Sequence, residues 1–220
     1  MTSGEGEAAN LAAMRADYLR ARLRREDLRD DPVAQFDAWL DDAIRAQVIE
    51  PNAMSLATVD GEGRPLTRTV LLKGLDARGF VFFTNLESRK ARHIAGNPHV
   101  SLLFPWLALE RQVIVTGIAD KISTAESLRY FLTRPRDSQL AAWASQQSRA
   151  ISSRKVLEME WEQIKAKFGA GKVPLPSFWG GFRVRPATVE FWQGGPNRLH
   201  DRFQYSREGD GPWKVERLAP

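Results

Sequence analysis

From residue 54 onward, apolar and polar residues alternate with the two-residue period of β-strands. Strands are predicted at 54–59, 66–73 and 80–84, and glycine-rich turns separate them. Further strands are expected over 100–104 and 112–122, in two aromatic segments between 174 and 195, and in a terminal hairpin of 203–205 and 213–218. Consecutive strands joined by short turns pair antiparallel. The pattern predicts seven or eight antiparallel strands, and closing them into a barrel would remove the exposed edges.

About five helices are inserted in or appended to these strands. Residues 1–10 are small and polar and are expected to be disordered, and Leu11, Met14, Tyr18 and Leu23 predict an amphipathic helix within 8–25. Asp31 and Pro32 begin a helix whose apolar stripe is Val33, Phe36, Leu40, Ala43 and Ile44. We therefore expect an N-terminal arm over 1–30 and one domain over 31–220, with a mainly β (α+β) fold.

Later helices begin at capping residues. Ser88 caps a short helix that runs to about residue 95, and a capping box at Ser123 opens a helix that ends before Pro135. A helix is predicted over 137–145. Another is expected over 153–168, closed by Gly169, with Val156, Met159 and Ile164 toward the core.

Composition excludes several kinds of site. The 220 residues contain no cysteine, which excludes disulfides and thiolate metal sites, and the three histidines lack metal-ligand spacing. No apolar run approaches the roughly 20 residues of a membrane span, and the acidic N-terminus differs from a secretory signal. We expect a soluble, cytoplasmic protein without a metal. The net charge of +5 comes from interspersed charges without a nucleic-acid-binding motif, which favours small phosphorylated ligands over nucleic acid.

Two groups of residues could bind phosphate. Arg89 and Lys90 stand in the first turn of the helix after Ser88, where free N–H groups and the helix dipole favour an anion. Tyr130 and Arg134 are four residues apart and predicted to share a helix face, which Ser138 continues. The alternatives are a mildly destabilised surface helix for the first group and a solvated helix end for the second.

The stretch 174–202 combines aromatic residues, two glycine pairs, and a cluster of two arginines and one histidine, Arg198, His200 and Arg202. Glycine pairs let the backbone approach another group closely. This mixture indicates a site for a flat, anionic ligand, and the alternative is a β-hairpin with an aromatic core face and a charged turn.

Several of these segments together resemble the pyridoxamine 5'-phosphate oxidase family. The resemblance runs from about residue 15 to residue 220 and rests on ordered motifs: Arg68-Thr-Val-Leu-Leu-Lys73, Phe83-Thr-Asn-Leu-Glu-Ser-Arg-Lys90, Val100-Ser-Leu-Leu-Phe-Pro-Trp106, Glu110-Arg-Gln-Val113, Arg134-Pro-Arg-Asp-Ser-Gln139, Pro174-Leu-Pro-Ser-Phe-Trp-Gly-Gly-Phe-Arg183, Glu190-Phe-Trp-Gln-Gly-Gly195 and Arg198-Leu-His-Asp-Arg202. It implies an FMN-binding split β-barrel that forms a homodimer, with active sites at the subunit interface.

The resemblance also implies residue roles. The FMN site would comprise Arg68, Thr69, Val70, Leu71, Leu72, Lys73, Phe83, Thr84, Arg89, Lys90, Gln112, Gln147, Ser148, Trp192 and Arg202. Arg68, Arg89 and Lys90 would hold the FMN phosphate. Lys73, Tyr130, Arg134 and Ser138 would hold the substrate phosphate, Arg198 and His200 would lie over the pyridine ring as catalytic residues, and Arg15 and Tyr18 would belong to a lid. Thr69 and Phe83 depart from the family pattern, which puts a hydroxyl contact to the cofactor in doubt.

The implied reaction is the oxidation of pyridoxamine 5'-phosphate or pyridoxine 5'-phosphate at the 4' carbon to pyridoxal 5'-phosphate. FMN would carry the electrons to dioxygen, which gives hydrogen peroxide. Two alternatives are another split-barrel oxidoreductase with a different flavin or a deazaflavin, and a non-enzymatic carrier of pyridoxal phosphate.

Overall fold

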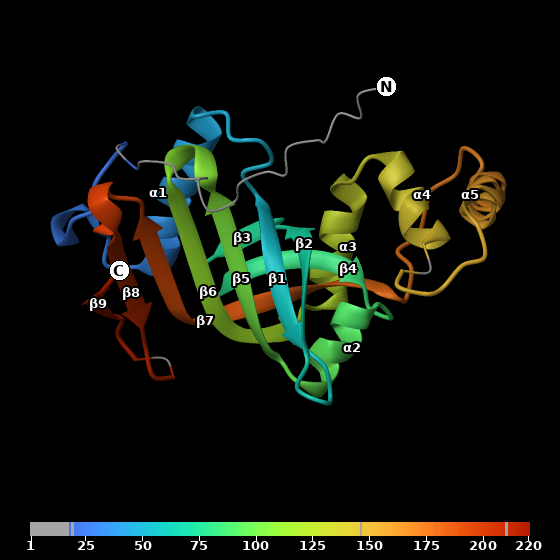
Figure 1. Ribbon diagram of the computed structural model, residues 1–220. Helices are drawn as coiled ribbons and strands as arrows, with labels where there is room; N and C mark the ends of the chain where they lie inside the picture. Colours follow the sequence, from blue (N-terminus) through green and yellow to red (C-terminus); the bar gives the residue numbers. More distant parts are fainter. Residues whose placement is uncertain (1–17, 19, 146, 210) are drawn as a thin grey trace, which may run out of the picture.

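Nine strands form a single antiparallel sheet in the computed structural model, which describes residues 18, 20–145, 147–209 and 211–220 (Figure 1). The strands are β1 (Ala53–Val59), β2 (Pro65–Leu71), β3 (Gly74–Asp76), β4 (Gly79–Asn85), β5 (His99–Trp106), β6 (Arg111–Lys121), β7 (Trp179–Gln193), β8 (Asp201–Ser206) and β9 (Lys214–Leu218). Their order is β2-β1-β5-β6-β7-β4-β3, and β8 pairs with both β7 and β9. The predicted antiparallel, mainly β fold is confirmed, and β3 is an additional strand within the expected turn at 74–79.

Strand β7 is the longest strand and connects two ends of the curved sheet. Its first residues pair with β4, and its last residues pair with β8, while β6 lies along most of its length. The expectation of two separate strands here is wrong. Pro186 has no N–H to donate, but the β6–β7 register shifts there: Thr116 pairs with Thr188 and Gly117 with Pro186, so Ala187 of β7 is left out of the pairing and the strand continues.

Helix α1 (Pro32–Arg45) covers the main core. The Asp31 side chain accepts hydrogen bonds from the N–H groups of Val33 and Ala34, which confirms the predicted start. Phe36 is fully buried and packs edge-on against Phe80 and Phe104 at centroid distances of 4.9 and 4.6 Å. The predicted stripe is partly wrong, since Ile44 is 55% exposed and the buried Trp39 takes its place.

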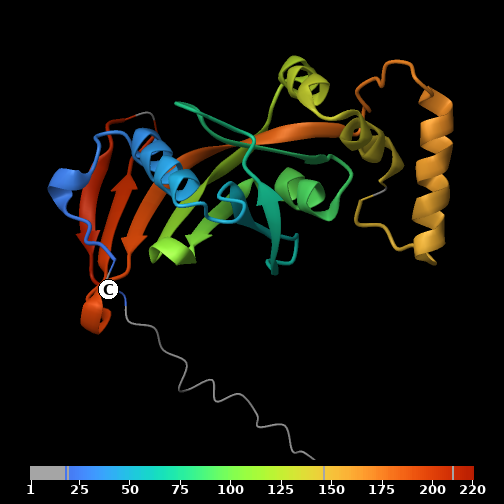
Figure 2. The ribbon, with the colours of Figure 1, turned by 90° about the horizontal axis from the view of Figure 1, so that it is seen from above.

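The other helices are α2 (Arg89–Gly96), α3 (Thr124–Thr133), α4 (Arg136–Ala144) and α5 (Arg154–Phe168). The caps predicted at Ser88 and Ser123 are both present. Helices α4 and α5 lie beyond the first residues of β7, at the opposite end from β8 and β9 (Figures 1 and 2). Met159 on α5 is 51% exposed, contrary to expectation, because α5 packs through its other face, with Trp161, Ile164 and Phe168 against a smaller cluster around Phe131 and Trp179.

The helix predicted within 8–25 falls mostly outside the described residues, as does Arg15. Where the chain is described, Tyr18 and residues 20–24 are not helical, and only a short 3-10 turn forms at Arg25–Asp27. Here the N–H groups of Arg20 and Leu23 donate to the side chains of Glu110 and Asp201, at 3.0 and 3.1 Å. Hydrogen bonds to the rest of the protein thus replace helical ones.

The described segments include no helix that is both long enough and apolar enough to span a bilayer.

Candidate active site

A cavity of about 810 Å³ lies between β2, β4, α2 and α4 near the first residue of β7. Its described lining includes five cations and no Asp or Glu: Arg68, Lys73, Arg89, Lys90 and Arg134. We call it the cationic cavity. The remaining lining residues are Leu66, Thr67, Thr69, Val70, Leu71, Phe83, Thr84, Asn85, Tyr130, Ala141, Ala142, Ser145, Gln147, Ser148 and Trp179. Such an arrangement favours an anionic ligand.

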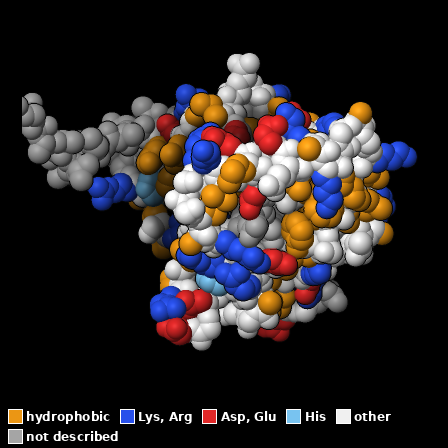
Figure 3. All heavy atoms as spheres, turned by 90° about the vertical axis from the view of Figure 1, so that its right-hand side faces the viewer, with side chains coloured by type: hydrophobic (Ala, Val, Ile, Leu, Met, Phe, Trp, Pro, Cys, Tyr) orange, Lys and Arg blue, Asp and Glu red, His pale blue; other side chains and the backbone are white. Residues whose placement is uncertain are grey.

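Positive charge extends from this cavity to the surface. Arg89 also lines a neighbouring hollow of about 430 Å³ with Arg92, His93 and Arg64, and the last of these is paired there with Asp60. Figure 3 views the molecule from the side of α4 and α5 and shows Lys and Arg side chains gathered near the middle of this face. A positive field of this kind attracts anions from solution.

Lys90 is a buried cation for which the described residues supply no acidic partner. It is 8% exposed, and its Nζ donates to Thr84 Oγ1 at 3.1 Å and to Gln147 Oε1 at 2.9 Å. Burial, and secondarily the charge of Arg68, lower the pKa of Lys90 from 10.5 to about 8. All its named partners are neutral. A bound anion would supply the missing negative charge.

Arg68 is held on one side and unpaired on the other. Its Nη1 donates to the Leu56 carbonyl at 3.0 Å and to Thr58 Oγ1 at 2.7 Å. Its Nη2 is buried and has no hydrogen-bond partner among the described residues. Burial and the nearby charge of Arg89 lower the pKa of Arg68. A buried donor without a partner is costly, so this nitrogen points to a ligand.

Arg134, which also lines this cavity, has a second guanidinium nitrogen without a hydrogen-bond partner among the described residues. Arg134 Nη1 is buried and, within the described part of the chain, has no partner, while its guanidinium lies 4.9 Å from the Trp179 ring centroid. Burial lowers the pKa of Arg134 and raises that of Tyr130. The prediction placed Arg134 on the same helix face as Tyr130. In the structure, Arg134 is instead the extended residue that follows the C-terminal end of α3. Both nevertheless line the cavity.

Stacked aromatic rings form one wall of the cavity. The Phe83 ring stacks on Tyr130 at 4.0 Å and on Trp179 at 5.1 Å. The first glycine pair allows this packing, because a Cβ on Gly181 would lie 2.9 Å from the Phe83 ring. The close approach predicted for that pair is thus confirmed, and its partner is a protein side chain.

The remaining predicted residues lie at the other end of β7. Trp192 contacts Tyr18 edge-on at 5.6 Å and lies 4.7 Å from the His200 ring. The Gly195 N–H donates to His200 Nδ1 at 3.2 Å, and a Cβ on Gly194 would lie 2.7 Å from the Tyr18 ring. We call Tyr18, Trp192, Arg198, His200 and Arg202 the aromatic turn. Gln112 is opposite Trp192 in the β6–β7 register.

Two arginines of this turn differ in their freedom. Arg198 is exposed and has a φ of 62°, in the left-handed region that non-glycine residues seldom adopt. Arg202 is engaged, since its Nε and Nη2 bond Glu190 at 2.8 and 3.1 Å and its Nη1 bonds the Ala219 carbonyl. The hydrogen bonds to Glu190, together with its charge, raise the pKa of Arg202. Arg198 is therefore the arginine of the turn that is presented to solvent.

The structure thus divides the predicted site into two groups. The cationic cavity includes eleven of the predicted cofactor residues: Arg68, Thr69, Val70, Leu71, Lys73, Phe83, Thr84, Arg89, Lys90, Gln147 and Ser148. Leu72 is buried in the core, and its N–H and carbonyl both bond Asn52. Ser138 lies on α4 and is absent from the described lining.

The prediction missed Trp179, Asn85, Ser145 and Thr58. Trp179 stood in a quoted motif but was given no role. Thr58 lies on β1, ten residues from Arg68, and only the β1–β2 pairing brings it near.

Comparison with known proteins assigns the family. Residues 40–168 match the model described as "Pyridoxamine 5'-phosphate oxidase". Residues 179–220 match that of the "Pyridoxine 5'-phosphate oxidase C-terminal dimerisation region". A protein of Rippkaea orientalis named pyridoxine/pyridoxamine 5'-phosphate oxidase is 59% identical over 211 residues, which cover 96% of this chain and 100% of the relative.

Solved structures agree with this assignment. PhzG from Burkholderia lata, solved with tetrahydrophenazine-1-carboxylic acid, has a TM-score of 0.84 and 30% identity, covering 89% of this chain and 95% of its own. A pyridoxamine 5'-phosphate oxidase-related, FMN binding protein from Nostoc punctiforme has a TM-score of 0.67 at 18% identity, covering 84% of this chain and 96% of its own, and supports the fold. The split-barrel prediction is confirmed, and the chain belongs to the pyridoxamine 5'-phosphate oxidase family.

Proposed function

We propose that this protein oxidises pyridoxamine 5'-phosphate and pyridoxine 5'-phosphate to pyridoxal 5'-phosphate, with FMN as cofactor and dioxygen as electron acceptor. The alcohol and dioxygen give the aldehyde and hydrogen peroxide, and the amine also consumes water and releases ammonia. The name of the 59% identical relative supports this substrate class.

The observation that carries the proposal is a pair of buried, unpartnered guanidinium nitrogens in one cavity that contains no described carboxylate. Each nitrogen is a positively charged donor without an acceptor, and an anion would supply one. Two such donors in one cavity are consistent with two bound phosphate groups. Arg68, Arg89 and Lys90 would hold the FMN phosphate. Lys73, Tyr130 and Arg134 would hold the substrate phosphate.

The protein's contribution to the reaction would be chiefly positioning. When bound, FMN would supply the redox chemistry, the transfer of two electrons from the substrate to dioxygen. The phosphate clamp fixes one end of the substrate and so lowers the entropy cost of aligning the 4' carbon. The Phe83–Tyr130–Trp179 stack excludes water from one side. Arg198 and His200 would orient the pyridine ring.

A homodimer would complete the site. The cationic cavity lies at the first residue of β7, whereas the aromatic turn follows its last residue. A strand of 15 residues extends by roughly 45 Å, so one chain does not bring the two groups together. The C-terminal region that matches the family's dimerisation model contains most of the aromatic turn. The partner subunit would therefore place Gln112, Trp192, Arg198, His200 and Arg202 against the cavity.

Other roles belong to the same proposal. Thr69, Val70, Leu71, Thr84, Gln147 and Ser148 would contact FMN, and Phe83 would do so without the hydroxyl of a tyrosine. Leu72, whose polar backbone groups already bond Asn52, would contribute indirectly. Tyr18 would join the lid, and Ser138 would adjust the substrate phosphate site from α4. Residues 31–220 would form the single FMN-binding domain.

Purified protein tests the proposal directly. We expect a flavin absorption spectrum, intrinsic or after reconstitution with FMN. Pyridoxine 5'-phosphate added in air should give equal amounts of aldehyde and peroxide. A protein that takes up no flavin, or a flavin-loaded protein that binds pyridoxal 5'-phosphate without consuming oxygen from either substrate, would contradict the proposal. The second result would favour the carrier.

A further inference from the structure

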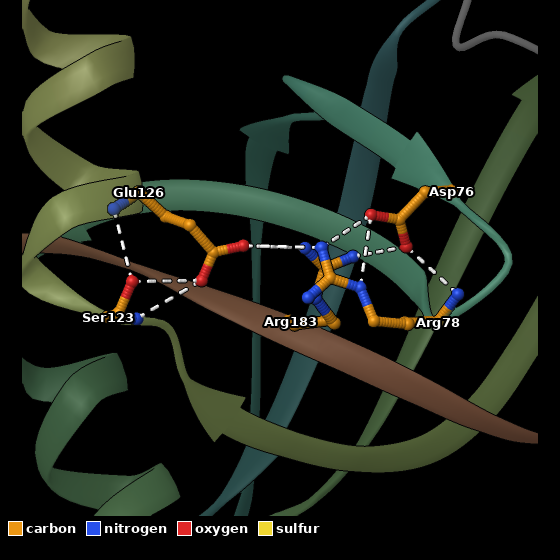
Figure 4. Close-up of polar contacts among 5 residues, drawn as sticks. All are labelled: Asp76, Arg78, Ser123, Glu126 and Arg183. Atoms are coloured by element: carbon orange, nitrogen blue, oxygen red, sulfur yellow. Dashed lines mark hydrogen bonds and ion pairs between the residues drawn. The ribbon is translucent and has the colours of Figure 1, made fainter.

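A network of ion pairs joins β3, α3 and β7 (Figure 4). Arg183 on β7 is 9% exposed and lies between two carboxylates. Its Nη1 is 2.6 Å from Asp76 Oδ1, and its Nη2 is 3.3 Å from Glu126 Oε1. Arg183 thus connects the short strand β3 to helix α3.

Both carboxylates are also fixed by their own elements. Glu126 accepts hydrogen bonds from the N–H and hydroxyl of Ser123, and the Ser123 hydroxyl in turn accepts the Glu126 N–H. Asp76 accepts the Arg78 N–H at 2.9 Å, and the Arg78 guanidinium bonds Asp76 and reaches Glu126. Burial raises the pKa of Asp76, but the hydrogen bonds from Arg78 and the charge of Arg183 outweigh it and lower that pKa overall.

The network lies directly next to the substrate side of the cavity. Lys73 immediately precedes β3, and Tyr130 follows Glu126 by four residues on α3, one turn along the same face. A second hollow of about 340 Å³ is lined by Asp76, Glu126 and Arg183, and it shares Lys73, Phe83 and Tyr130 with the cationic cavity. The three shared residues form the wall between the two spaces.

We infer that Arg183 is a positioning residue for the substrate's phosphate group, because its two ion pairs set the separation of Lys73 from Tyr130. Arg183 itself is absent from the described lining of the cationic cavity. Its effect is therefore transmitted through β3 and α3. The inference rests on the proposed function for the identity of the phosphorylated ligand.

Arg183→Gln tests this role. The probes are 4-deoxypyridoxine 5'-phosphate, which cannot be oxidised at the 4' carbon, and 4-deoxypyridoxine, which lacks the phosphate. Both are titrated into FMN-loaded protein by calorimetry. We expect the Kd of the phosphorylated probe to rise about tenfold and that of the unphosphorylated probe to change less than about twofold. KM for pyridoxine 5'-phosphate should rise in parallel, with kcat and the Kd of FMN nearly unchanged.

Arg185→Gln is the matched control. Arg185 lies two residues further along β7 and pairs with Asp120 of β6 at 2.6 Å, and its side chain is 55% exposed. Removing this ion pair should leave both probe affinities unchanged. If Arg183→Gln fails to fold, Arg183→Lys retains one of the two contacts and should give an intermediate rise in Kd.

A double-mutant cycle with Tyr130→Phe tests the route of transmission. If Arg183 acts through Tyr130, the two effects on the phosphorylated probe should be smaller together than their sum. Additive effects, an unchanged Kd in Arg183→Gln, or equal losses for both probes would overturn the inference. A wild-type protein that binds the phosphorylated probe but makes no aldehyde from pyridoxine 5'-phosphate would overturn the proposed function instead, and the Kd comparison would still decide the role of Arg183.

Discussion

Thr58 holds Arg68 in place from a neighbouring strand. It is fully buried, and its hydroxyl accepts from Arg68 Nη1 at 2.7 Å and lies 3.1 Å from His93 Nδ1. Thr58→Val keeps the shape but removes this acceptor. We expect the Kd of FMN, measured by quenching of flavin fluorescence, to rise about ten- to hundredfold, since a hydrogen bond to a charged group contributes about 1.5–3 kcal/mol.

The matched control for this prediction is Thr116→Val. Thr116 is exposed on β6, and its hydroxyl bonds that of Thr188 at 2.6 Å, outside the cavity. Its replacement should leave the Kd of FMN unchanged. Equal FMN affinity in Thr58→Val and wild type would show that Leu56 alone anchors Arg68.

The pKa of Lys90 makes stability depend on pH in the protein without FMN. Lys90 has a pKa of about 8 when folded and 10.5 as its ordinary value. Below pH 8 it is charged in both states, so the full cost of burying the charge is present. Between pH 8 and 10.5 the unfolded state binds more protons, so this cost is relieved as pH rises.

Lys90→Met should therefore stabilise the FMN-free protein at pH 7, and the difference in Tm from wild type should shrink as pH rises from 8 to 10.5. Calorimetric scans at several pH values measure this. If Lys90 helps to hold the FMN phosphate, as proposed, the Kd of FMN for wild type should rise above pH 8 and that of Lys90→Met should not follow it. A difference in Tm that is the same at every pH would contradict the assignment.

Arg198 is the residue of the aromatic turn that we expect to affect chemistry most. Its side chain is exposed in the single chain, and its backbone has a φ of 62°. We predict that Arg198→Ala lowers kcat by about 10² or more while FMN stays bound. Arg154→Ala, on the exposed face of α5, is the control and should leave kcat unchanged. Near wild-type turnover in Arg198→Ala would exclude this role.

For single residues, the sequence motifs predicted which Arg and Lys residues line the cavity, but not which residues contact them. Arg89 and Lys90 follow a capping serine, so their position at a helix start is local information. The partners of Arg68 on β1, and the stack of Phe83 on Tyr130 and Trp179, depend on strand pairing and on packing between distant segments. Such contacts have no signature in residue spacing.

At the level of secondary-structure elements, the close approach of β6 to β7 depends on Gly117, which has no side chain. A Cβ on Gly117 would lie 2.0 Å from the Arg185 carbonyl oxygen, where the register shifts opposite Pro186. We expect Gly117→Ala to lower the free energy of unfolding by about 2 kcal/mol or more, because backbone must move to relieve the clash. Denaturant unfolding measures the change.

Gly96→Ala provides the contrast. Gly96 is the last residue of α2, and no atom would lie within 4 Å of an added Cβ. That substitution should be neutral or stabilising by up to about 1 kcal/mol, since alanine favours a helix over glycine. Similar losses in both variants would show that the register shift tolerates a side chain.

Local signals also explain which elements could be predicted. Helices α1 and α3 begin at Asp31 and Ser123, whose side chains bond the first N–H groups, and both starts were predicted. The N-terminal helix was not borne out at Tyr18 or residues 20–24, because Glu110 and Asp201 accept N–H groups there. Strand β7 was predicted as two separate aromatic segments, because its continuity depends on pairing with β6 along most of its length, which residue spacing within the segments does not show.

For the whole molecule, the separation of the two residue groups means that mixed dimers of two variants can test whether each active site contains residues of both subunits. The cationic cavity and the aromatic turn lie at opposite ends of β7. If each site combines the cavity of one chain with the turn of its partner, a change in the cavity of one chain and a change in the turn of the other fall in the same site. The second site of that dimer then consists of unchanged residues.

Co-expression of Arg134→Ala with Arg198→Ala, each carrying a different affinity tag, yields heterodimers that two successive purifications isolate. Each variant alone should be nearly inactive. The isolated heterodimer should recover about half of wild-type kcat, and an unfractionated equal mixture about a quarter, because half of its dimers are mixed and each has one intact site. Sites built within single chains would give no recovery, since both chains then carry a damaged site. A heterodimer as inactive as its parents would therefore refute the interface arrangement, while FMN retained by Arg198→Ala would still identify the cavity as the cofactor site.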